Sequence, residues 1–350
     1  MLIADRYEPT GSASTGGMGE VIECIDRHLD RRVVVKRLQT GIEERRLLDE
    51  QRALAHLRSK HVVQLFDIVK LRDRGNEEKA IVLEYIEGKN LEPNSYAADH
   101  SYLKVLWQIA AGLQEIHDAG VIHRDIKPNN IRLDKEGIVK IIDFGLARSS
   151  DNAKTQNIIG TPVFMAPELW KDPTINFTKA IDVYAFAATA VALLNAQIPR
   201  ALAMRPPGSV QISTLASCLK GLPANIVKTI HQCLDPKPEN RPSMREVKES
   251  ISKNLLQNKH RALVVMGSQS HYLDAKNRKI SLKAGTVGSL TIAYDGLDFK
   301  VDAASGAVYL NNFAAKTGAQ VPGCCVITFG DHSQGRVFVT FDVSNPEVMP

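Results

Sequence analysis

The alternation of apolar and polar residues predicts strands in the first part of the chain. Residues 7–38 carry short β-branched runs between turn residues, a pattern typical of an antiparallel meander. Two further apolar runs, 61–71 and 79–88, flank the polar stretch "RDRGNEE" at 72–78, so we expect two more strands joined by a loop there. Between these groups of strands, residues 43–57 have helical spacing of leucines.

The pattern changes twice more along the chain. It is mostly helical from about residue 99, interrupted by a hairpin-like segment and by a polar loop at 148–161. The apolar run "DVYAFAATAVALLNAQI" holds about 15 apolar residues, short of the roughly 20 that a membrane span needs, so we expect a buried helix and no membrane span. Short β-rich runs separated by Gly, Asp and Asn return after residue 257.

These patterns together predict an α+β protein of two domains. Residues 1–257 form a bilobal domain, with a β-rich N-lobe at about 1–86 and a mostly helical C-lobe at about 87–257. Residues 258–350 form a small all-β, sandwich-like domain, for which an immunoglobulin-like fold is one option, although the Cys, Trp, Cys framework is missing.

Composition narrows the class of protein. The 350 residues are 44% hydrophobic and 24% charged, which suits globular domains, and the net charge of +5 is too small and too evenly spread for a nucleic-acid binder. The five cysteines lack the spacing of a zinc site or a disulfide framework, and charges stand where a signal peptide would be apolar. We therefore expect a cytoplasmic protein with no nucleic-acid partner.

Two charged residues in the first 50 occupy unusual positions. Glu50 lies three residues after Leu47 and four before Leu54, which puts a carboxylate in the apolar stripe of the predicted helix. Lys36 ends the β-branched run "VVVK", in which successive side chains point to opposite faces, so it could point inward toward Glu50. Taken alone, such a pair is more often an incidental surface contact.

The glycines of "STGGMGEV" precede that run. A glycine-rich turn lets backbone N–H groups approach an anion closely, but most such turns are only turns. A dinucleotide-binding site would need the last glycine to open a helix, whereas "EVIECID" continues as strand, which disfavours it.

A second pair of polar residues brackets a predicted hairpin. Asn130 and Asp143 flank "IRLDKEGIVKII", which folds naturally as two short strands about the turn "DKEG". Both side chains then emerge at the open end, where two oxygen ligands suit Mg²⁺. A hairpin without a metal is the alternative.

Eight motifs in register identify a resemblance. "GGMGEV", "VVVK", Glu50, "HRDIKPNN", "DFG", "GTPVFMAPE", "DVYAF" and "ENRPS" follow one another over about residues 7–255. This part of the chain resembles eukaryotic-type serine/threonine protein kinases and is most similar to soluble bacterial members.

The resemblance implies a role for each matching residue. Asp125 would orient the attacking hydroxyl and accept its proton, and Lys36, paired with Glu50, would hold the α- and β-phosphates of ATP. Asn130 and Asp143 would bind Mg²⁺. Lys127 would place positive charge beside the γ-phosphate, and Lys127 with Thr161 indicates a serine or threonine substrate in proteins.

The resemblance also implies the residues around the nucleotide. Ser14 replaces the first loop glycine, Val34 replaces the usual alanine above the adenine, and Arg132 stands where an apolar side chain normally lies below the base. The stem of Arg132 could pack there while its guanidinium reaches water or stacks on the ring, which would make ATP affinity modest. The expected nucleotide contacts are Gly16, Gly17, Gly19, Val21, Val34, Lys36, Leu83, Glu84, Ile86, Asn90 and Arg132.

Other matching residues are expected to support the site. In the family the residue at His123 fixes the loop and the aspartate at Asp182 holds its backbone, while Glu168 forms a buried ion pair with Arg241. Arg124 often pairs with a phosphate on the activation segment, which here would run from Asp143 to Glu168. The candidate phosphosites are Thr155, our first choice for autophosphorylation, with Ser149 and Ser150.

Two functions compete at this point. The first is an active kinase acting on protein substrates, for which a homodimer could serve trans-autophosphorylation. The second is a catalytically weak scaffold with the same fold, which docks partners through the C-terminal β domain. The adjacent Cys324 and Cys325 of that domain should point to opposite faces of a strand, one of them into the core.

Overall fold

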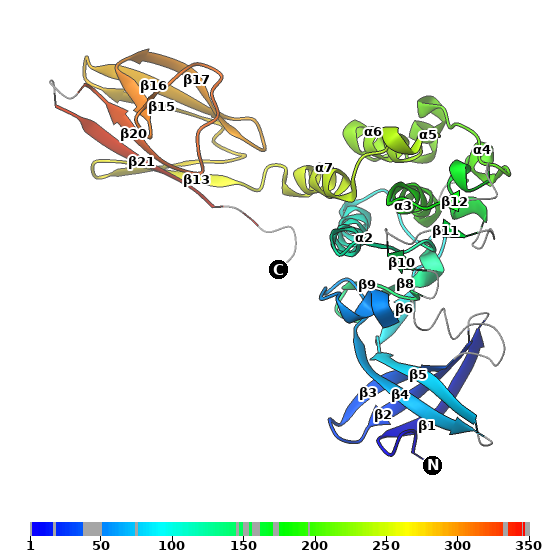
Figure 1. The fold of residues 1–350 in the computed structure, drawn as a ribbon. Helices are drawn as coiled ribbons and strands as arrows, with labels where there is room; N and C mark the ends of the chain where they lie inside the picture. The colour runs from blue at the N-terminus through cyan, green and yellow to red at the C-terminus, as the bar shows by residue number, and fades with distance from the viewer. Residues whose placement is uncertain are drawn as a thin grey trace. The chain divides into compact units, whose positions relative to one another are not determined.

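The chain divides into two compact units, Met1–Ile251 and Ser252–Pro350. Figure 1 shows both as a ribbon, and each is described by itself. The structure is a computed structural model, and it describes residues 2–16, 19–37, 51–73, 76–144, 147–149, 154–155, 162–170, 175–194, 197–331, 335–344 and 346.

The first unit begins with an antiparallel five-stranded sheet. Its strands are β1 (Tyr7–Gly16), β2 (Gly19–Asp26), β3 (Arg31–Arg37), β4 (Leu65–Asp73) and β5 (Asn76–Glu84), in the order β1-β2-β3-β5-β4. The predicted meander is confirmed.

The prediction of a loop at 72–78 is wrong for residues 72–73 and 76–78, which belong to strands. β4 continues to Asp73 and β5 begins at Asn76, with those two residues paired across the hairpin. Backbone pairing carries a strand through polar residues, so polarity alone did not locate the turn.

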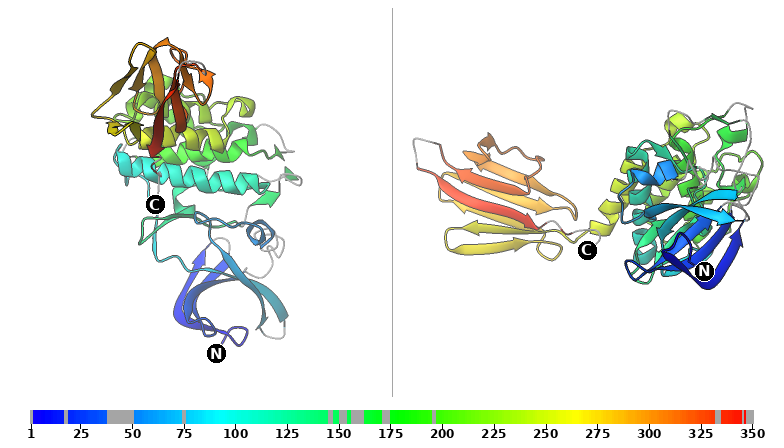
Figure 2. Two further views of the ribbon diagram at one scale, coloured as in Figure 1. Left: turned by 90° about the vertical axis from the view of Figure 1, so that its left-hand side faces the viewer. Right: turned by 60° about the horizontal axis from the view of Figure 1, so that its bottom comes forward.

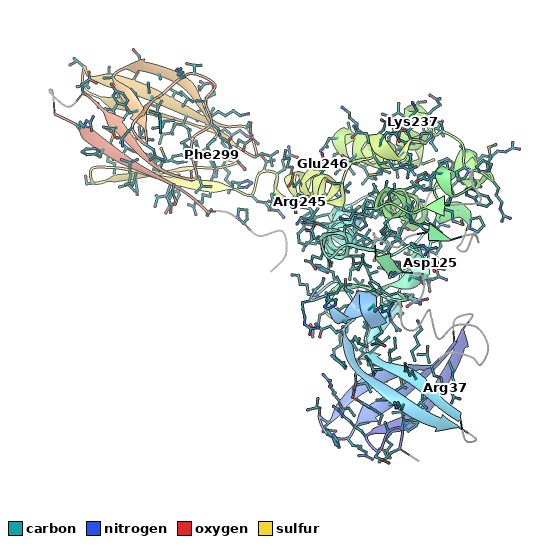
Figure 3. The ribbon with its side chains drawn as sticks, viewed as in Figure 1. Arg37, Asp125, Lys237, Arg245, Glu246 and Phe299 are labelled. Carbon is teal, nitrogen blue, oxygen red and sulfur yellow. The ribbon has the colours of Figure 1, made fainter. Side chains whose placement is uncertain are left out.

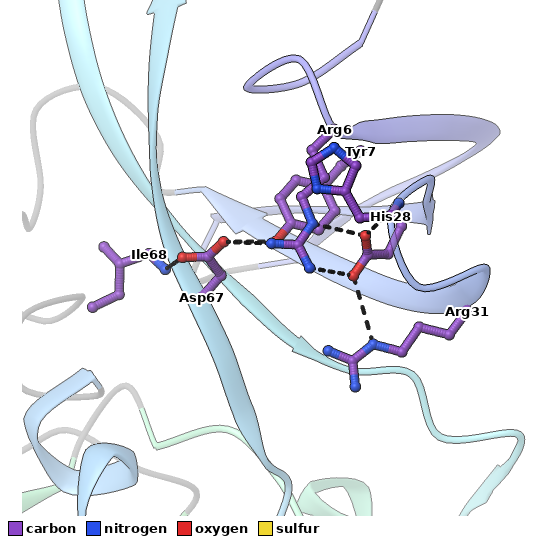
Figure 4. A network of polar contacts seen from close by, with 7 residues as sticks. Arg6, Tyr7, His28, Arg31, Asp67 and Ile68 are labelled. Carbon is purple, nitrogen blue, oxygen red and sulfur yellow. Dashed lines mark hydrogen bonds and ion pairs between the residues drawn. The ribbon is translucent and has the colours of Figure 1, made fainter.

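A polar network joins the start of β1, the end of β2 and β4. Arg6 donates from Nε and Nη2 to the two carboxylate oxygens of Asp26, both at 2.7 Å, and Tyr7 Oη donates to Asp67 at 2.8 Å. The Asp26 side chain is fully buried, and the hydrogen bonds from Arg6 outweigh that burial and lower the pKa of Asp26 to about 2. Figure 4 shows how this network ties β1, β2 and β4 together.

Helices make up most of the remaining first unit. They are α2 (His100–Asp118), α3 (Ala180–Leu193), α4 (Arg200–Ala203), α5 (Ile212–Cys218), α6 (Ala224–Cys233) and α7 (Met244–Leu256). Asp99 caps α2 by accepting the Tyr102 N–H at 3.0 Å. The run after residue 180 is a buried helix, as predicted, and α2 and α3 lie side by side with their axes roughly aligned (Figure 2).

No helix in the described part of the chain is both long and apolar enough to cross a membrane. Of the helix predicted at 43–57, the structure describes only the end, where residues 51–55 are helical and Ala53 and Leu54 are buried.

Short strands complete the first unit. β6 (Gly88–Asn90), β8 (Ile131–Asp134) and β9 (Val139–Ile141) form one small sheet. β7 (Val121–Ile122) pairs with β10 (Arg148–Ser149), and β11 (Lys154–Thr155) pairs with β12 (Ile175–Asn176). The prediction of a polar loop at 148–161 is therefore wrong for residues 148–149 and 154–155, because two-residue strands have no periodicity that a sequence pattern could reveal.

The second unit is built from two antiparallel sheets. The larger has the order β14-β13-β21-β20-β18-β19, with bounds Gln269–Leu273, Arg261–Met266, Val337–Ser344, Cys324–Phe329, Val308–Leu310 and Phe313–Ala314. The smaller is β15-β16-β17, with bounds Lys279–Ala284, Gly288–Tyr294 and Phe299–Gly306.

Both sheets contribute to one apolar core, and Figure 2 shows them facing each other. Cys325 is buried in that core whereas Cys324 is exposed, as the strand alternation predicts. An all-β domain is thus confirmed, and its immunoglobulin-like character stays a prediction.

Candidate active site

The hairpin of β8 and β9 positions the two expected metal ligands. Its strands pair Ile131 with Ile141, and Gly137 adopts a φ of +80° in the turn, a conformation that a glycine reaches without strain. Asn130 directly precedes β8, and its carbonyl accepts the N–H of Ile142 at 2.9 Å. Because Ile142 is followed by Asp143, the hairpin brings the backbones of Asn130 and Asp143 to the same end.

Asp125 is held beside Asn130. The Asn130 amide nitrogen donates to the Asp125 backbone carbonyl and to its Oδ2, both at 2.8 Å. Lys127 Nζ donates to both carboxylate oxygens of Asp125, at 3.0 and 2.8 Å. A cation and an amide therefore fix the carboxylate of Asp125, which is 5% exposed and is labelled in Figure 3.

Lys36 reaches the same region from the N-terminal sheet. Its Nζ donates to Asp143 Oδ1 at 2.9 Å, and the Lys36 side chain is 8% exposed. In β3, Val33 and Val35 face the apolar core while Val34 and Lys36 point to the opposite face, as the strand alternation predicts. Asn130 thus contacts Asp125 and Lys36 contacts Asp143, and the two pairs are linked through the hydrogen bond from the Ile142 N–H to the Asn130 carbonyl, one residue before Asp143.

Asp182 of α3 organises the loop that carries Asp125. Its Oδ2 accepts the backbone N–H of His123 and its Oδ1 accepts that of Arg124, both at 2.8 Å. Arg124 has a φ of +72°, a left-handed conformation that costs a non-glycine residue about 1 kcal/mol or more. The predicted supporting role of Asp182 is confirmed, and these two hydrogen bonds offset the backbone strain.

The fully buried Asp182 remains ionised. Burial raises the pKa of Asp182, but the hydrogen bond from His117 Nε2 at 3.0 Å and the one from the Arg124 N–H lower it by more, so the net pKa lies below the ordinary value. His117 on α2 thus completes the support of the loop.

His123 is likewise structural. The Asp125 N–H donates to His123 Nδ1 at 3.3 Å, which places the imidazole proton on Nε2, and Nε2 donates to the Ile142 carbonyl at 3.1 Å. Its ring meets Phe144 edge to face, with centroids 4.6 Å apart. His123 therefore joins the Asp125 loop to the Asp143 segment, as expected.

A buried ion pair joins two distant segments. Arg241 donates from Nη1 and Nη2 to the two oxygens of Glu168, both at 2.7 Å, and its side chain is fully buried. Arg241 also donates to the carbonyls of Asp235 and Ala180, at 2.8 and 2.9 Å. The predicted pairing of Glu168 with Arg241 is confirmed.

The region expected to hold the adenine is lined from several strands. Val34 pairs with Leu83 across β3 and β5, and Leu83 is 6% exposed. The Glu84 side chain accepts from Lys140 Nζ, at 2.7 and 2.9 Å, and from the Gln64 N–H at 3.2 Å. This contact ties the end of β5 to β9.

Arg132 differs from its expected arrangement. Its Nη2 donates to the Gly88 carbonyl at 2.6 Å, so the guanidinium is bound to backbone instead of reaching only water. Its Nε is buried with no hydrogen-bond partner. The antiparallel pairing of β6 with β8, which sets Asn90 opposite Arg132, brings Gly88 within reach.

Some expected site residues lie outside the described part of the chain. These are Glu50, Gly17, Ser150 and Thr161. Of Gly16, Gly19, Ser149 and Thr155 the backbone alone is described; Gly16 pairs with Gly19 across the β1–β2 hairpin, and Gly19 opens a strand and not a helix. Val21 pairs with Lys36.

Comparison with known proteins decides the family. The protein kinase domain family matches residues 7–251, which is most of the chain. The chain belongs to the protein kinase family. The bilobal α+β fold of the first unit agrees with that membership.

The chain is similar to several bacterial proteins. It is 32% identical over 213 residues to a probable serine/threonine-protein kinase of Bifidobacterium longum, a match that covers 57% of this chain and 27% of the relative. A probable serine/threonine-protein kinase of Corynebacterium glutamicum is 32% identical over 212 residues, 57% of this chain and 32% of the relative. A probable serine/threonine-protein kinase of Clostridium acetobutylicum is 27% identical over 265 residues, a match that covers 69% of this chain and 38% of the relative. The chain spans about a third of the length of these relatives.

The kinase residues present fit a magnesium ion with ATP. The Asn130 amide nitrogen is engaged by Asp125, which leaves the amide oxygen for a cation, and Asp143 adds a carboxylate. Within the described ranges no cluster of three or more His, Cys, Asp or Glu residues could hold a metal. An amide and a carboxylate suit Mg²⁺, which fills its remaining positions with water and phosphate oxygens.

Three supporting residues of this kinase went unnoticed in the sequence. His117 lies four residues after Leu113 on the apolar face of α2, which could have marked it as a buried histidine. His61 donates from Nδ1 to the Val139 carbonyl at 3.1 Å, and burial lowers its pKa to about 4, so it is neutral. The sequence around Lys140 does not predict its contact with Glu84, because that contact depends on the fold.

Proposed function

We propose that this chain is a serine/threonine protein kinase that transfers the γ-phosphoryl group of MgATP to hydroxyl groups of proteins. The observation that carries the proposal is that the Asp125–Asn130 contact and the Lys36–Asp143 contact are linked by the backbone hydrogen bond between Asn130 and Ile142. The names of the bacterial relatives support the class of substrate.

Asp125 acts on the substrate hydroxyl. Its carboxylate accepts a hydrogen bond from that hydroxyl, aligns the oxygen with the γ-phosphorus and takes up the proton as the new O–P bond forms and the bond to ADP breaks. Asn130 and Lys127 hold the carboxylate, so it does not need to reorganise during transfer.

Cationic groups stabilise the charge that develops on the phosphoryl oxygens. Lys36 offers its ammonium to the α- and β-phosphates, and Lys127 offers positive charge beside the transferred group. Asn130 and Asp143 would hold Mg²⁺, which neutralises charge on the β- and γ-phosphates when it is bound. The nucleotide itself would lie against Gly16, Gly17, Gly19, Val21, Val34, Leu83, Glu84, Ile86, Asn90 and Arg132.

Transfer of labelled phosphate from ATP to a generic protein substrate tests this function. We expect the wild-type chain to label the substrate and Asp125→Asn to lower the rate by at least about a hundredfold. If the wild type and Asp125→Asn transfer equally little, the scaffold function, with docking through the C-terminal β domain, replaces the kinase function.

We further infer autophosphorylation at Thr155, with Ser149 and Ser150 as the other candidates. Thr155 lies in β11, whose backbone pairs with β12 at Ile175. Arg124 stacks on Phe177, and its guanidinium carbon lies 3.6 Å from the ring centroid. Phe177 is two residues after Ile175, the partner of Thr155. Mass spectrometry after incubation with MgATP should find phosphate on Thr155, and an unmodified but fully active enzyme would contradict this site.

A cytoplasmic location and a second copy as the partner in trans-autophosphorylation complete the proposal. The location is supported by the five cysteines, which are all free thiols.

A further inference from the structure

A cavity in the first unit shares no lining residue with the candidate active site. Its volume is about 300 Å³, which is at the lower end for small-molecule sites. It is lined by α2, by the start of α3 and by the segment 241–245, with side chains that include Gln114, His117, Asp118, Lys179, Ala180 and Arg245. None of the residues that we assign to catalysis or to ATP lines it.

The charge of this cavity favours an anion. Its ionised lining groups are Asp118, Lys179, Arg241 and Arg245, and Arg241 is neutralised by Glu168. Lys179 is exposed, and its side chain makes no hydrogen bond or ion pair with the described residues. Arg245 approaches Asp118 only to 3.5 Å, and both side chains are more than half exposed, so this pair is weak and the guanidinium can turn to a ligand.

The wall also offers a hydrogen-bond acceptor. Gln114 donates from Nε2 to Asp118 at 3.2 Å, and its Oε1 is buried with no hydrogen-bond partner. An unpaired buried acceptor is costly. Because Oε1 has almost no exposed surface, a ligand hydroxyl reaches it when the Gln114 side chain, held by one 3.2 Å hydrogen bond to the exposed Asp118, turns toward the cavity, and that contact removes the cost. Ser243 does not add to the site, because its hydroxyl and N–H are both engaged by Glu246.

We propose that this cavity binds a small hydroxylated organic phosphate. The phosphate lies between Lys179 and Arg245, and a hydroxyl of the ligand donates to Gln114 Oε1. The apolar side chains of Ala180 and Val183 pack against the carbon body of the ligand.

The lining residues connect this cavity to the candidate active site. His117 donates to Asp182, and Asp182 holds the N–H groups of His123 and Arg124 directly before Asp125. A ligand that packs against His117 therefore stabilises the arrangement of Asp182, and we expect it to protect those two amides from hydrogen exchange.

Calorimetric titration of the full chain with glycerol 3-phosphate tests the site. We expect saturable binding, and weaker binding of propyl phosphate, which lacks the hydroxyls, and of glycerol, which lacks the charge. Binding of glycerol 3-phosphate that is absent up to about 10 mM, or equal binding of glycerol, overturns the proposal.

Matched variants locate the ligand. Lys179→Gln and Arg245→Gln should each weaken binding about tenfold, whereas Lys237→Gln, which removes the same charge from an exposed position outside the cavity, should leave it unchanged (Figure 3). Ala180→Leu, which fills space without changing charge, should also weaken it. If Lys127→Gln abolishes binding and Lys179→Gln does not, the phosphate occupies the candidate active site and the proposal is wrong.

Amide hydrogen exchange tests the connection to the active site. Saturating glycerol 3-phosphate should slow exchange at His123 and Arg124 severalfold in the wild type and not in Lys179→Gln. Unchanged exchange in the wild type with the ligand bound contradicts the connection. Neither readout uses phosphoryl transfer, so failure of the proposed kinase function would not affect them.

Discussion

The ammonium of Lys36 and the carboxylate of Asp143 lie 107 residues apart in the chain and meet at 2.9 Å. Lys36 comes from the N-terminal sheet and Asp143 from the segment that follows the β8–β9 hairpin. Their contact brings the cation that we propose for the phosphates next to the carboxylate that we propose for Mg²⁺, as a nucleotide with its metal requires.

Asp182→Asn should impair both stability and catalysis. The amide cannot carry the negative charge that His117 and the two backbone N–H groups stabilise, and the strained φ of Arg124 loses its support. We expect a loss of about 3 kcal/mol in the free energy of unfolding of the first unit, measured by urea denaturation. Asp118→Asn, an exposed change on α2, should cost less than about 1 kcal/mol. Equal losses in the two variants would contradict this role.

Glu168→Gln should destabilise the first unit by about 3 to 5 kcal/mol, because it leaves the guanidinium of Arg241 buried beside a neutral amide. A double-mutant cycle with Arg241→Met measures the coupling directly. As a matched control, Arg245→Met should have little effect, since its partner Asp118 is exposed. An additive double mutant would mean that the two residues do not interact.

Asp26 should make the stability of the N-terminal sheet fall in acid. Its pKa is lowered in the folded state from 3.8 to about 2 by the hydrogen bonds from Arg6. A lowered folded pKa gives stability that is complete above the unfolded value and is lost as pH falls through the folded value. We therefore expect the loss between about pH 4 and pH 2. Thermal denaturation at several pH values should show that Asp26→Asn removes this part of the dependence, and an unchanged profile would refute the assignment.

Arg132→Leu should tighten ATP binding severalfold. The substitution removes a guanidinium whose Nε is buried without a partner and restores an apolar surface below the base, at the cost of one hydrogen bond to Gly88. Fluorescence titration with an ATP analogue measures the change. Arg132→Lys, which keeps a cation, should not bind more tightly than the wild type. Weaker binding by Arg132→Leu would mean that the guanidinium stacks on the base.

Local sequence patterns predicted the elements that form within one short stretch of the chain. The β1–β2–β3 meander, the β8–β9 hairpin and the buried α3 helix have clear periodicity or turn residues, and Asn130 and Asp143 followed from the hairpin alone. The motif resemblance added Asp182, Glu168 and Arg241, which no periodicity distinguishes from other charged residues.

Contacts between distant segments that no motif marks could not be predicted. The bond from Arg132 to Gly88 and the ion pair of Lys140 with Glu84 depend on the placement of four separate strands. The stacking of Arg124 on Phe177 and the two-residue strands β10 and β11 have the same origin. Such contacts follow from tertiary packing and leave no spacing in the sequence.

Phosphoryl transfer by Lys36→Met, beside Lys237→Met, tests the central claim most directly. Both changes remove one lysine charge, but of the two lysines only Lys36 contacts Asp143. Lys237 is exposed and directly precedes the short helix Pro238–Asn240. We predict that Lys36→Met lowers transfer from labelled ATP by about a hundredfold or more while Lys237→Met keeps the wild-type rate. A Lys36→Met enzyme that transfers phosphate at the wild-type rate would contradict the proposed site.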